Sequence, residues 1–489
     1  MIADIASILS DSFGVSQWVA IALIKTMIVA TVFLPAISVL AMLSIWAERK
    51  VAGHIQGRLG PKHVGPFGLF QSLADGVKLL CKEDIVPQGA DHFLFRLAPY
   101  LAFAPVFAAF LAIPFGPQFV FEDALNVGVL YLLAVLSLEI TGVILSGWAS
   151  NSKWAIYGAM REACQMVSYE IPLGVAILTG VMIAGSLNLV ELSFLQGGGL
   201  HTWFIYHNPF LFAAFFIYFV ASLASAKRAP FDLPESESEL VAGFHTEYSG
   251  LRWSFFFFAE YSGMFVIGCI QAILFLGGWN SPLGPIDPIY ALLGYDPVWV
   301  GEMYLTGQLF LEGSWSEMAV AMTPEGDGLL GGAFGIAILN MYGMSWLIGK
   351  ALLVVFLHMW IRWTLPRIRI DQVMHGCVKA LLPISLALWV GAALWLVLIK
   401  PTADYQGVTP NVAHLTGEVP AVQVITQIVL TAIGVVLFGF YSLIIFGAVL
   451  SRRSAPKKGM FEDVMPVGQT AFTRGSEYVP DSERSLAQE

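Results

Sequence analysis

Hydrophobic positions along this chain fall into long uninterrupted runs, separated by polar connections. A helix rising 1.5 Å per residue needs about 20 apolar residues to cross the ~30 Å hydrocarbon layer of a bilayer. None of the runs alternates like a barrel strand, so helices must satisfy the backbone hydrogen bonds. The pattern predicts an all-α, polytopic transmembrane bundle of about nine helices at approximately 17–46, 98–117, 125–147, 159–187, 209–226, 253–278, 344–365, 379–400 and 421–450.

The connection 46–87 has a pattern of its own. Its glycines, with Pro61 and Pro66, end any helix after Gly53 and predict a structured turn. From Phe67 onward apolar residues recur at helical spacing, and charged residues occupy the other face. This pattern predicts an amphipathic helix lying at the membrane surface. A plain surface anchor explains the helix, but not the basic glycine turn that precedes it.

Composition fits a lipid environment. Of the 489 residues, 57% are hydrophobic and only 12% are charged, too few charges to cover a water-facing surface. No internal repeat is evident, which argues against an inverted-repeat transporter. Residues 1–16 lack a basic leader, so no cleaved signal peptide is expected and the first helix serves as its own insertion signal.

The charges are sorted by side. All but three of the 25 Lys and Arg residues fall in alternate connections: 48–97, 148–161, 227–252, 362–379 and the tail from 451. The positive-inside rule then predicts an extracytoplasmic N-terminus and a cytoplasmic C-terminus. Segment 279–343 carries seven acids and no Lys or Arg, which indicates a solvated acidic cap with some structure of its own.

Four cysteines, Cys81, Cys164, Cys269 and Cys377, stand far apart. No metal-ligand or CxxC spacing occurs, so neither an iron–sulfur cluster nor a disulfide framework is indicated. Each is expected to be a small buried hydrophobic residue. The polar tail 451–489, rich in Pro, Ser and Glu, is predicted to be disordered.

An acidic connection at 226–252 is the first candidate for chemistry. It holds five carboxylates within sixteen residues: Asp232, Glu235, Glu237, Glu239 and Glu247. In a helix over 234–242, Glu235 and Glu239 repel each other at i,i+4, and Arg228 and Arg252 flank the cluster. Crowded carboxylates have raised, coupled pKa values and exchange protons near neutral pH. A solvated charge run is the ordinary alternative.

Acids inside the membrane are the second candidate. Glu139, Glu170 and Glu260 lie within predicted helices, about 10–16 Å below the same surface at 1.5 Å per residue. An intramembrane carboxylate is costly unless protonated or paired, which indicates a function such as proton transfer. Lys25 and Lys350 lie near the outer ends of helices, where snorkelling to the interface is one explanation.

Four long motifs give the chain a resemblance to a known family. They are Glu48-Arg49-Lys50 continuing through Gln56, Arg58, Gly65-Pro66-Phe67-Gly68, Asp75 and Lys82-Glu83; Gly147 to Lys153 with Gln165 to Pro172; Arg228 to Glu235 with Glu239 to Gly250; and Arg362 to Gln372 with Leu381-Leu382-Pro383. Together they resemble the H subunit of bacterial NADH:quinone oxidoreductase, respiratory complex I, whose mitochondrial equivalent is the first of the ND subunits. The resemblance covers about residues 15–400.

This resemblance implies an eight-helix membrane domain over 1–400, with the 279–343 insertion, a further helix in 401–450 and the 451–489 tail as additions. The family lines the tunnel by which ubiquinone or menaquinone reaches the terminal iron–sulfur cluster. The resemblance implies quinone as substrate and no directly bound cofactor, since flavin and iron–sulfur clusters belong to partner subunits. Expected partners are the peripheral-arm and antiporter-like subunits and membrane lipids, not nucleic acid, in the inner membrane of a bacterium.

The motifs also assign residues. By resemblance, the proton path would comprise Glu170, Glu235, Glu237, Glu239, Glu247 and Glu260, to which the depth of Glu139 adds a seventh. The quinone tunnel would comprise Trp46, Arg49, Arg58, Asp75, Arg228, Phe231 and Arg369, and no metal ligands are expected. One departure is Ser225, where the family usually has a glutamate. The alternatives are a membrane subunit of an energy-converting hydrogenase, a non-redox ion transporter and a structural membrane anchor.

Overall fold

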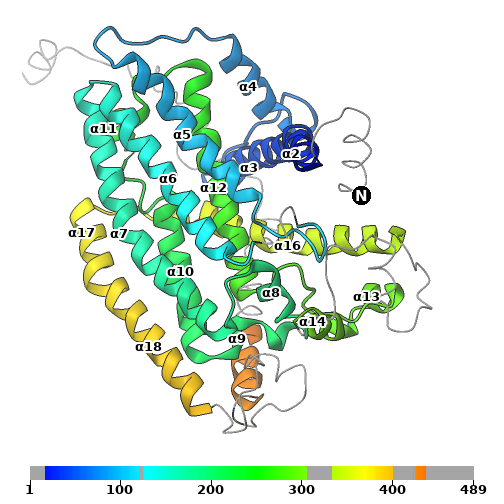
Figure 1. Ribbon diagram of the computed structural model, residues 1–489. Coiled ribbons are helices and arrows are strands. Elements are labelled where there is room, and N and C mark those ends of the chain that lie inside the picture. Colours follow the sequence, from blue (N-terminus) through cyan, green and yellow to red (C-terminus); the bar gives the residue numbers. More distant parts are fainter. Residues whose placement is uncertain are drawn as a thin grey trace, which may run out of the picture. The chain divides into compact units, whose positions relative to one another are not determined.

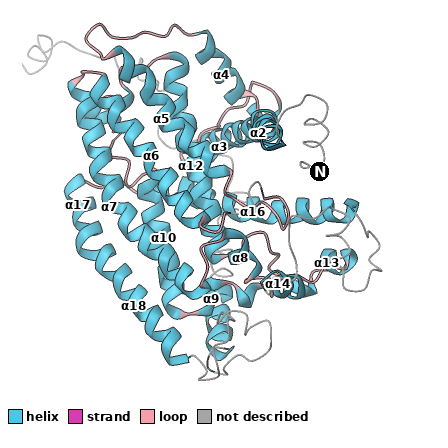
Figure 2. Cartoon of the chain, viewed as in Figure 1, coloured by secondary structure: helices cyan, strands magenta, loops and turns pink. Residues whose placement is uncertain are grey.

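The computed structural model describes residues 17–120, 125–234, 236–305, 333–399, 422 and 424–436. Throughout these ranges every regular element is a helix (Figures 1 and 2). The predicted all-α class is therefore confirmed. The chain divides into two units, 1–431 and 432–489, and everything below concerns the first. The predicted tail, and residues 306–332 of the acidic insertion, lie outside the described residues.

Seven helical segments are long and apolar enough to cross a membrane: Leu23–Ile55, His92–Phe110, Gly128–Ala149, Lys153–Ala184, Gly250–Phe275, Gly335–Thr364 and Ile370–Leu398. Two shorter apolar helices, Pro209–Ser225 and Val424–Val436, fall within the other two predicted spans. The chain is thus a multi-pass membrane protein.

The spans consist of α2 (Gln17–Ile28), η1 (Val29–Phe33) and α3 (Leu34–Ile55), then α5 (His92–Phe110), α6 (Gly128–Ala149), α7 (Lys153–Ala184), α10 (Pro209–Ser225), α12 (Gly250–Phe275) and α16 (Ala333–Thr364), with α17 (Ile370–Gly376), η6 (Cys377–Leu381) and α18 (Leu382–Ile399) at the end. η1 and η6 are single π-helical turns. They continue the flanking helices, as such turns usually do.

Helix α12 is the centre of the bundle. Nearly all of its second half is buried, from Ala259 to Phe275, and it packs against α3, α5, α10 and α16. Small residues let the helices approach closely, as is usual in membranes. A Cβ on Gly142 of α6 would lie 2.4 Å from the backbone nitrogen of Ala102 in α5, so only glycine fits there. By contrast, most of α18 is exposed.

Loops between the spans gather on two sides, which we name by their charge. On the basic side, the segments before α5 and after α11 (Glu237–Leu240) meet where Ser249 Oγ accepts a hydrogen bond from the Ile85 amide at 3.1 Å. The acidic side holds α8 (Leu189–Phe194), η3 (Leu200–Thr202), α9 (Phe204–His207), η5 (Gly284–Ile286), α13 (Pro288–Leu293) and α14 (Pro297–Leu305). The last three of these helices give the described part of the acidic insertion the structure expected of it.

Several local predictions were wrong in detail. The amphipathic helix α4 spans Gln71–Cys81, and Pro66–Gly68 before it form a separate turn, η2. Within the predicted helix 234–242 only α11 forms, and Val241 leaves it at φ 69°. The expected Glu235–Glu239 pair lies outside the described residues, because Glu235 is not among them.

The cysteine prediction was half right. Cys269 and Cys377 are buried, but Cys81 and Cys164 are exposed on α4 and α7. These two side chains occupy outward positions on their helices, so apolar character alone did not place them in the core.

Candidate functional site

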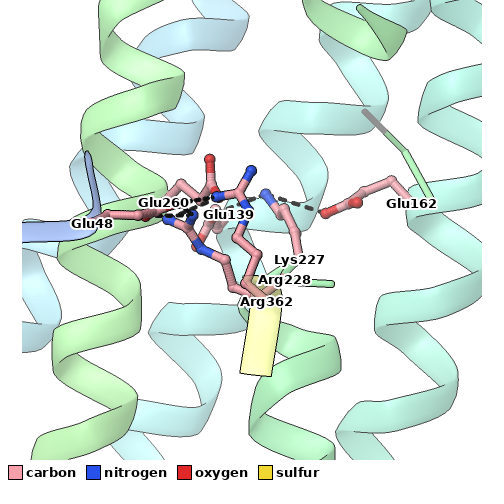
Figure 3. A network of polar contacts seen from close by, with 7 residues as sticks. All are labelled: Glu48, Glu139, Glu162, Lys227, Arg228, Glu260 and Arg362. Carbon is pink, nitrogen blue, oxygen red and sulfur yellow. Dashed lines mark hydrogen bonds and ion pairs between the residues drawn. The ribbon is translucent and has the colours of Figure 1, made fainter. Parts of the chain in front are cut away.

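Two consecutive basic residues at the end of α10, on the basic side, point their side chains into the interior. Lys227 and Arg228 directly follow the helix, and Lys227 adopts a left-handed φ of 54°. Both side chains are buried, at 5% and 0% exposure. A left-handed backbone is strained for a residue with a side chain, and such strain persists where surrounding interactions hold it. Figure 3 shows these side chains lying between helices and surrounded by carboxylates.

Arg228 joins two helices through their acids. Its Nη1 donates to both carboxylate oxygens of Glu48 on α3, at 3.1 and 2.9 Å. Its Nη2 lies 3.1 Å from Glu260 Oε1 on α12. Arg362 at the end of α16 donates to the same Glu48 at 2.6 Å, and the Arg228 guanidinium stacks over Tyr261 at 4.4 Å. Burial alone lowers the pKa of Arg228, but Glu260 and Glu48 raise it, so the side chain stays charged.

Lys227 forms the second half of the network. Its Nζ donates to Glu139 Oε1 on α6 at 3.0 Å and lies 3.1 Å from Glu162 Oε1 on α7. Burial lowers the pKa of Lys227, yet Glu139 and Glu162 together outweigh burial and raise it above its ordinary value. The ammonium also faces the Phe244 ring at 5.6 Å.

The network holds four carboxylates and three cations (Figure 3). Uncompensated charge in a low-dielectric interior is costly. The arrangement is electrically balanced when one of the four carboxyls carries a proton. Such a proton would lie among acids that come from four helices: α3, α6, α7 and α12.

The predicted proton-path acids divide into three groups. Glu139 and Glu260 belong to this network. Glu170 is half-buried on α7, near enough to Glu139 for their charges to interact. Glu239 lies on the surface, where Arg161 Nη1 donates to it at 2.6 Å, and Glu247 is partly buried. Glu235 and the side chain of Glu237 lie outside the described residues.

Four of the predicted tunnel residues meet on the outer face of α3. Arg49 forms an ion pair with Asp75 of α4, and Trp46 Nε1 donates to the Phe67 carbonyl at 3.3 Å. Beside them is a cleft of about 520 Å³ lined by Arg49, Arg58, Leu59, Gly60, Pro61, Lys62, His63 and Gln71. Its basic lining suits a polar or partly anionic ligand group.

Glu48 and Arg49 connect the cleft with the buried network. Consecutive helical residues point about 100° apart, so Glu48 faces inward at 4% exposure while Arg49 faces the cleft. The cleft and the network thus meet at two adjacent residues of one helix.

The other predicted tunnel residues lie apart from the cleft. Arg228 is within the network. Phe231 is buried against Tyr169, with ring centroids 5.3 Å apart. Arg369 is exposed at the start of α17, where its amide donates to Gln372 Oε1 at 3.4 Å.

Sequence reasoning missed half of the network. Glu162 and Lys227 were not singled out, and Glu48 and Arg362 were quoted only as parts of motifs. The two arginines that flank the acidic connection pair elsewhere, Arg228 within the buried network and Arg252 with Asp84 at 3.0 Å. Because the positive-inside rule expects a lysine or arginine directly after an apolar helix, Lys227-Arg228 gave no sign in the sequence that they are buried.

The helical bundle and its buried acid–base network define a multi-pass membrane protein with paired charges in its interior. A family model described as NADH dehydrogenase matches residues 27–393. A Chlorobium luteolum protein named as the H subunit of NADH-quinone oxidoreductase is 44% identical over 359 residues, covering 73% of this chain and 84% of the relative. A Cytophaga hutchinsonii protein named as a second H subunit of NADH-quinone oxidoreductase is 41% identical over 400 residues, covering 76% of this chain and all of the relative.

The chain therefore belongs to the NADH dehydrogenase family, as a member of its H-subunit group. The resemblance read from the four motifs is confirmed. The match ends at residue 393, so the last apolar segment and the tail lie beyond it.

Proposed function

We propose that this chain forms the quinone-access cleft and the first part of the proton path of a proton-translocating NADH:quinone oxidoreductase. One observation carries the proposal. Two adjacent residues of α3 face different sites: Arg49 lines a basic cleft, and Glu48 belongs to a buried network. Electrons arrive from the iron–sulfur subunits of a peripheral arm, and antiporter-like subunits continue the membrane arm. We infer a bacterial inner membrane as the location, with the basic side in the cytoplasm.

Reduction of a quinone to a quinol takes up two electrons and two protons. In a cleft closed by partner subunits, side chains and ordered water must supply those protons. In this proposal Arg49 and Arg58 of the cleft hold the headgroup and sense its change of charge, and Asp75 orients Arg49. That change acts on Glu48, the residue next to Arg49, and redistributes the single proton among the four acids of the network. Glu170, near Glu139, continues the route along α7.

Purification of the tagged chain in mild detergent tests this function. We expect flavin and iron–sulfur subunits to co-purify, and the assembly to reduce quinone with NADH in a reaction sensitive to tunnel-blocking compounds. Recovery with a nickel–iron hydrogenase and no response to quinone would instead identify an energy-converting hydrogenase. Recovery of the chain alone, with ion transport, would identify a transporter.

The acidic connection offers a mutational test in the same assembly. Glu239 is 56% exposed at its side chain, so its ion pair with Arg161 contributes at most about 1 kcal/mol to stability. Glu239→Gln should assemble normally and slow quinone reduction and proton pumping together. Unchanged turnover in the assembled variant would remove Glu239 from the path.

A further inference from the structure

Helix α16 carries a line of polar side chains, buried or partly buried, from one side of the molecule to the other. Arg362 joins the Glu48 network, His358 is fully buried one turn further along, and Lys350 is 7% exposed two turns beyond that. Tyr342 completes the line at the acidic side, where its hydroxyl donates to Asp287 at 2.7 Å. From Arg362 to Tyr342 the helix rises ~30 Å, the thickness of the hydrocarbon layer. The proposed quinone cleft and its proton path use neither His358 nor Lys350.

Lys350 faces the acidic side. Its Nζ donates to the backbone carbonyls of Gly278 and Asn280, at 2.9 and 2.6 Å, and lies 4.3 Å from the Trp203 ring centroid. Across the described ranges no carboxylate forms an ion pair with it. The Lys350 side chain therefore extends toward the acidic side, but its ammonium binds backbone carbonyls of the protein. A buried amine with only neutral partners can exchange its proton without breaking a salt bridge.

His358 lies about two turns of α16 from Lys350, toward the basic side. Its Nε2 lies 3.1 Å from Ser222 Oγ on α10, and its Nδ1 has no hydrogen-bond partner in the described part of the chain. Arg362, four residues away and on an adjoining part of the same helix face, pairs with Glu48. The imidazole thus lies next to the network that holds the exchangeable proton.

Polar groups from α10 and α12 lie at successive levels between His358 and the carbonyls that Lys350 reaches. One turn along α10 from Ser222, the Tyr218 hydroxyl donates to the Ile267 carbonyl at 3.0 Å. One turn along α12 from Ile267, Gln271 is fully buried, and neither its amide nitrogen nor its oxygen has a partner among the described residues.

The register of the two helices places Gln271 level with the side chain of Lys350, on the acidic side of the Lys350 backbone. A Cβ on Gly268 would lie 3.1 Å from the Ala351 carbonyl, so position 268 of α12 is level with the residue after Lys350. Gln271 is a turn nearer to the carbonyls that Lys350 reaches. An unsatisfied buried amide costs about 1–3 kcal/mol, and ordered water is the usual partner of such groups.

We propose that the chain carries its own proton route across the membrane, from the Glu48–Arg228–Glu260 network through His358 and water at Gln271 to Lys350, with release at the acidic side. The route rests on the proposed proton-translocating function and adds an exit within this subunit. In each cycle the neutral amine of Lys350 binds one proton from the Gln271 side and then releases one to water near Asn280. Lysine and network return to their starting states, so charge and protons balance.

Lys350→Arg separates this role from a structural one. Arginine keeps the positive charge, the donors to Gly278 and Asn280 and the stacking on Trp203, but it does not deprotonate in proteins. The measurement is the number of protons translocated per NADH oxidised by the whole complex in proteoliposomes. We expect Lys350→Arg to lower this ratio by about one proton per NADH. Gln271→Leu, which removes the water-binding amide, should do the same.

Thr179→Val is the matched control. It removes a fully buried hydroxyl from α7 that bonds only within its own helix, and it should leave the ratio unchanged. If Lys350→Arg and Gln271→Leu both keep the unaltered ratio, whatever their turnover, Lys350 only caps the end of α12 and the route does not exist. Failure of the unaltered complex to reduce quinone would instead refute the proposed function.

Discussion

Arg228 is the residue on which the buried network depends most. It is fully buried and faces both Glu48 and Glu260. Removing one member of a buried ion pair leaves an uncompensated charge and costs about 3–5 kcal/mol. Arg228→Met should therefore sharply lower the thermal stability and yield of the assembled complex.

A second substitution makes this expectation specific. Arg228→Met combined with Glu260→Gln removes one charge of each sign and leaves Glu48 paired with Arg362. At least half of the lost stability should return, as measured by thermal inactivation in a double-mutant cycle. A double variant no more stable than Arg228→Met would show that packing rather than charge explains the loss.

His245 gives the basic side a dependence on pH. Its ring packs between Phe244 and Trp253, at 5.0 and 6.1 Å, and burial together with the charge of Lys227 lowers its pKa from 6.5 to about 4. Between those pH values the unfolded chain binds a proton that the folded chain does not. Stability is therefore retained above about pH 6.5 and falls as the pH drops toward about 4.

The measurement is the melting temperature of the assembled complex at a series of pH values. His245→Gln cannot titrate, so its melting temperature should fall less steeply than that of the unaltered complex between pH 6.5 and 4. Parallel curves for the two proteins would mean that His245 takes no part in the acid sensitivity.

At the residue scale, sequence showed which side chains are out of place in a membrane but not what they contact. Glu139 and Glu260 were recognisable because they interrupt apolar runs. Their partners come from other segments: Lys227 is 88 residues from Glu139, and Arg362 is 314 residues from Glu48. Pairing across such separations depends on helix packing, which hydropathy does not specify.

The first connection shows how a turn positions an element. Gly68 ends η2 at φ 75°, and a Cβ there would lie 2.3 Å from the Pro61 carbonyl oxygen. A left-handed conformation costs a residue with a side chain about 1–2 kcal/mol. Gly68→Ala should thus move the cleft-lining loop relative to α4 and raise the KM for a soluble quinone several-fold, with a smaller change in kcat.

Gly76→Ala in the same helix is the control. No atom lies within 4 Å of a Cβ at that position, and alanine favours a helix interior by roughly 0.5–1 kcal/mol over glycine. Quinone kinetics should be unchanged in this variant. An equal rise in KM for both variants would show that α4 itself, rather than its entry turn, determines the cleft.

Elements were predictable where length and hydropathy alone define them. Each long span appears close to its predicted place because lipid requires a helix there. Boundaries and loop helices were less predictable. α16 begins about eleven residues before its predicted start, since its first turns pack against the acidic-side helices. α11 is shorter than expected because the chain leaves the helix at Val241, whose φ is 69°.

The whole molecule separates its charges between two sides, and this separation predicts its orientation. The basic side carries Lys153, and the acidic side carries Ile286, which is 86% exposed. The positive-inside rule places the first side in the cytoplasm. In a chain with Cys81 and Cys164 changed to serine, an impermeant thiol reagent should label Ile286→Cys in intact spheroplasts and Lys153→Cys only after permeabilisation. The reverse pattern would place the acidic side in the cytoplasm, and the proposed route would then carry protons from outside toward it.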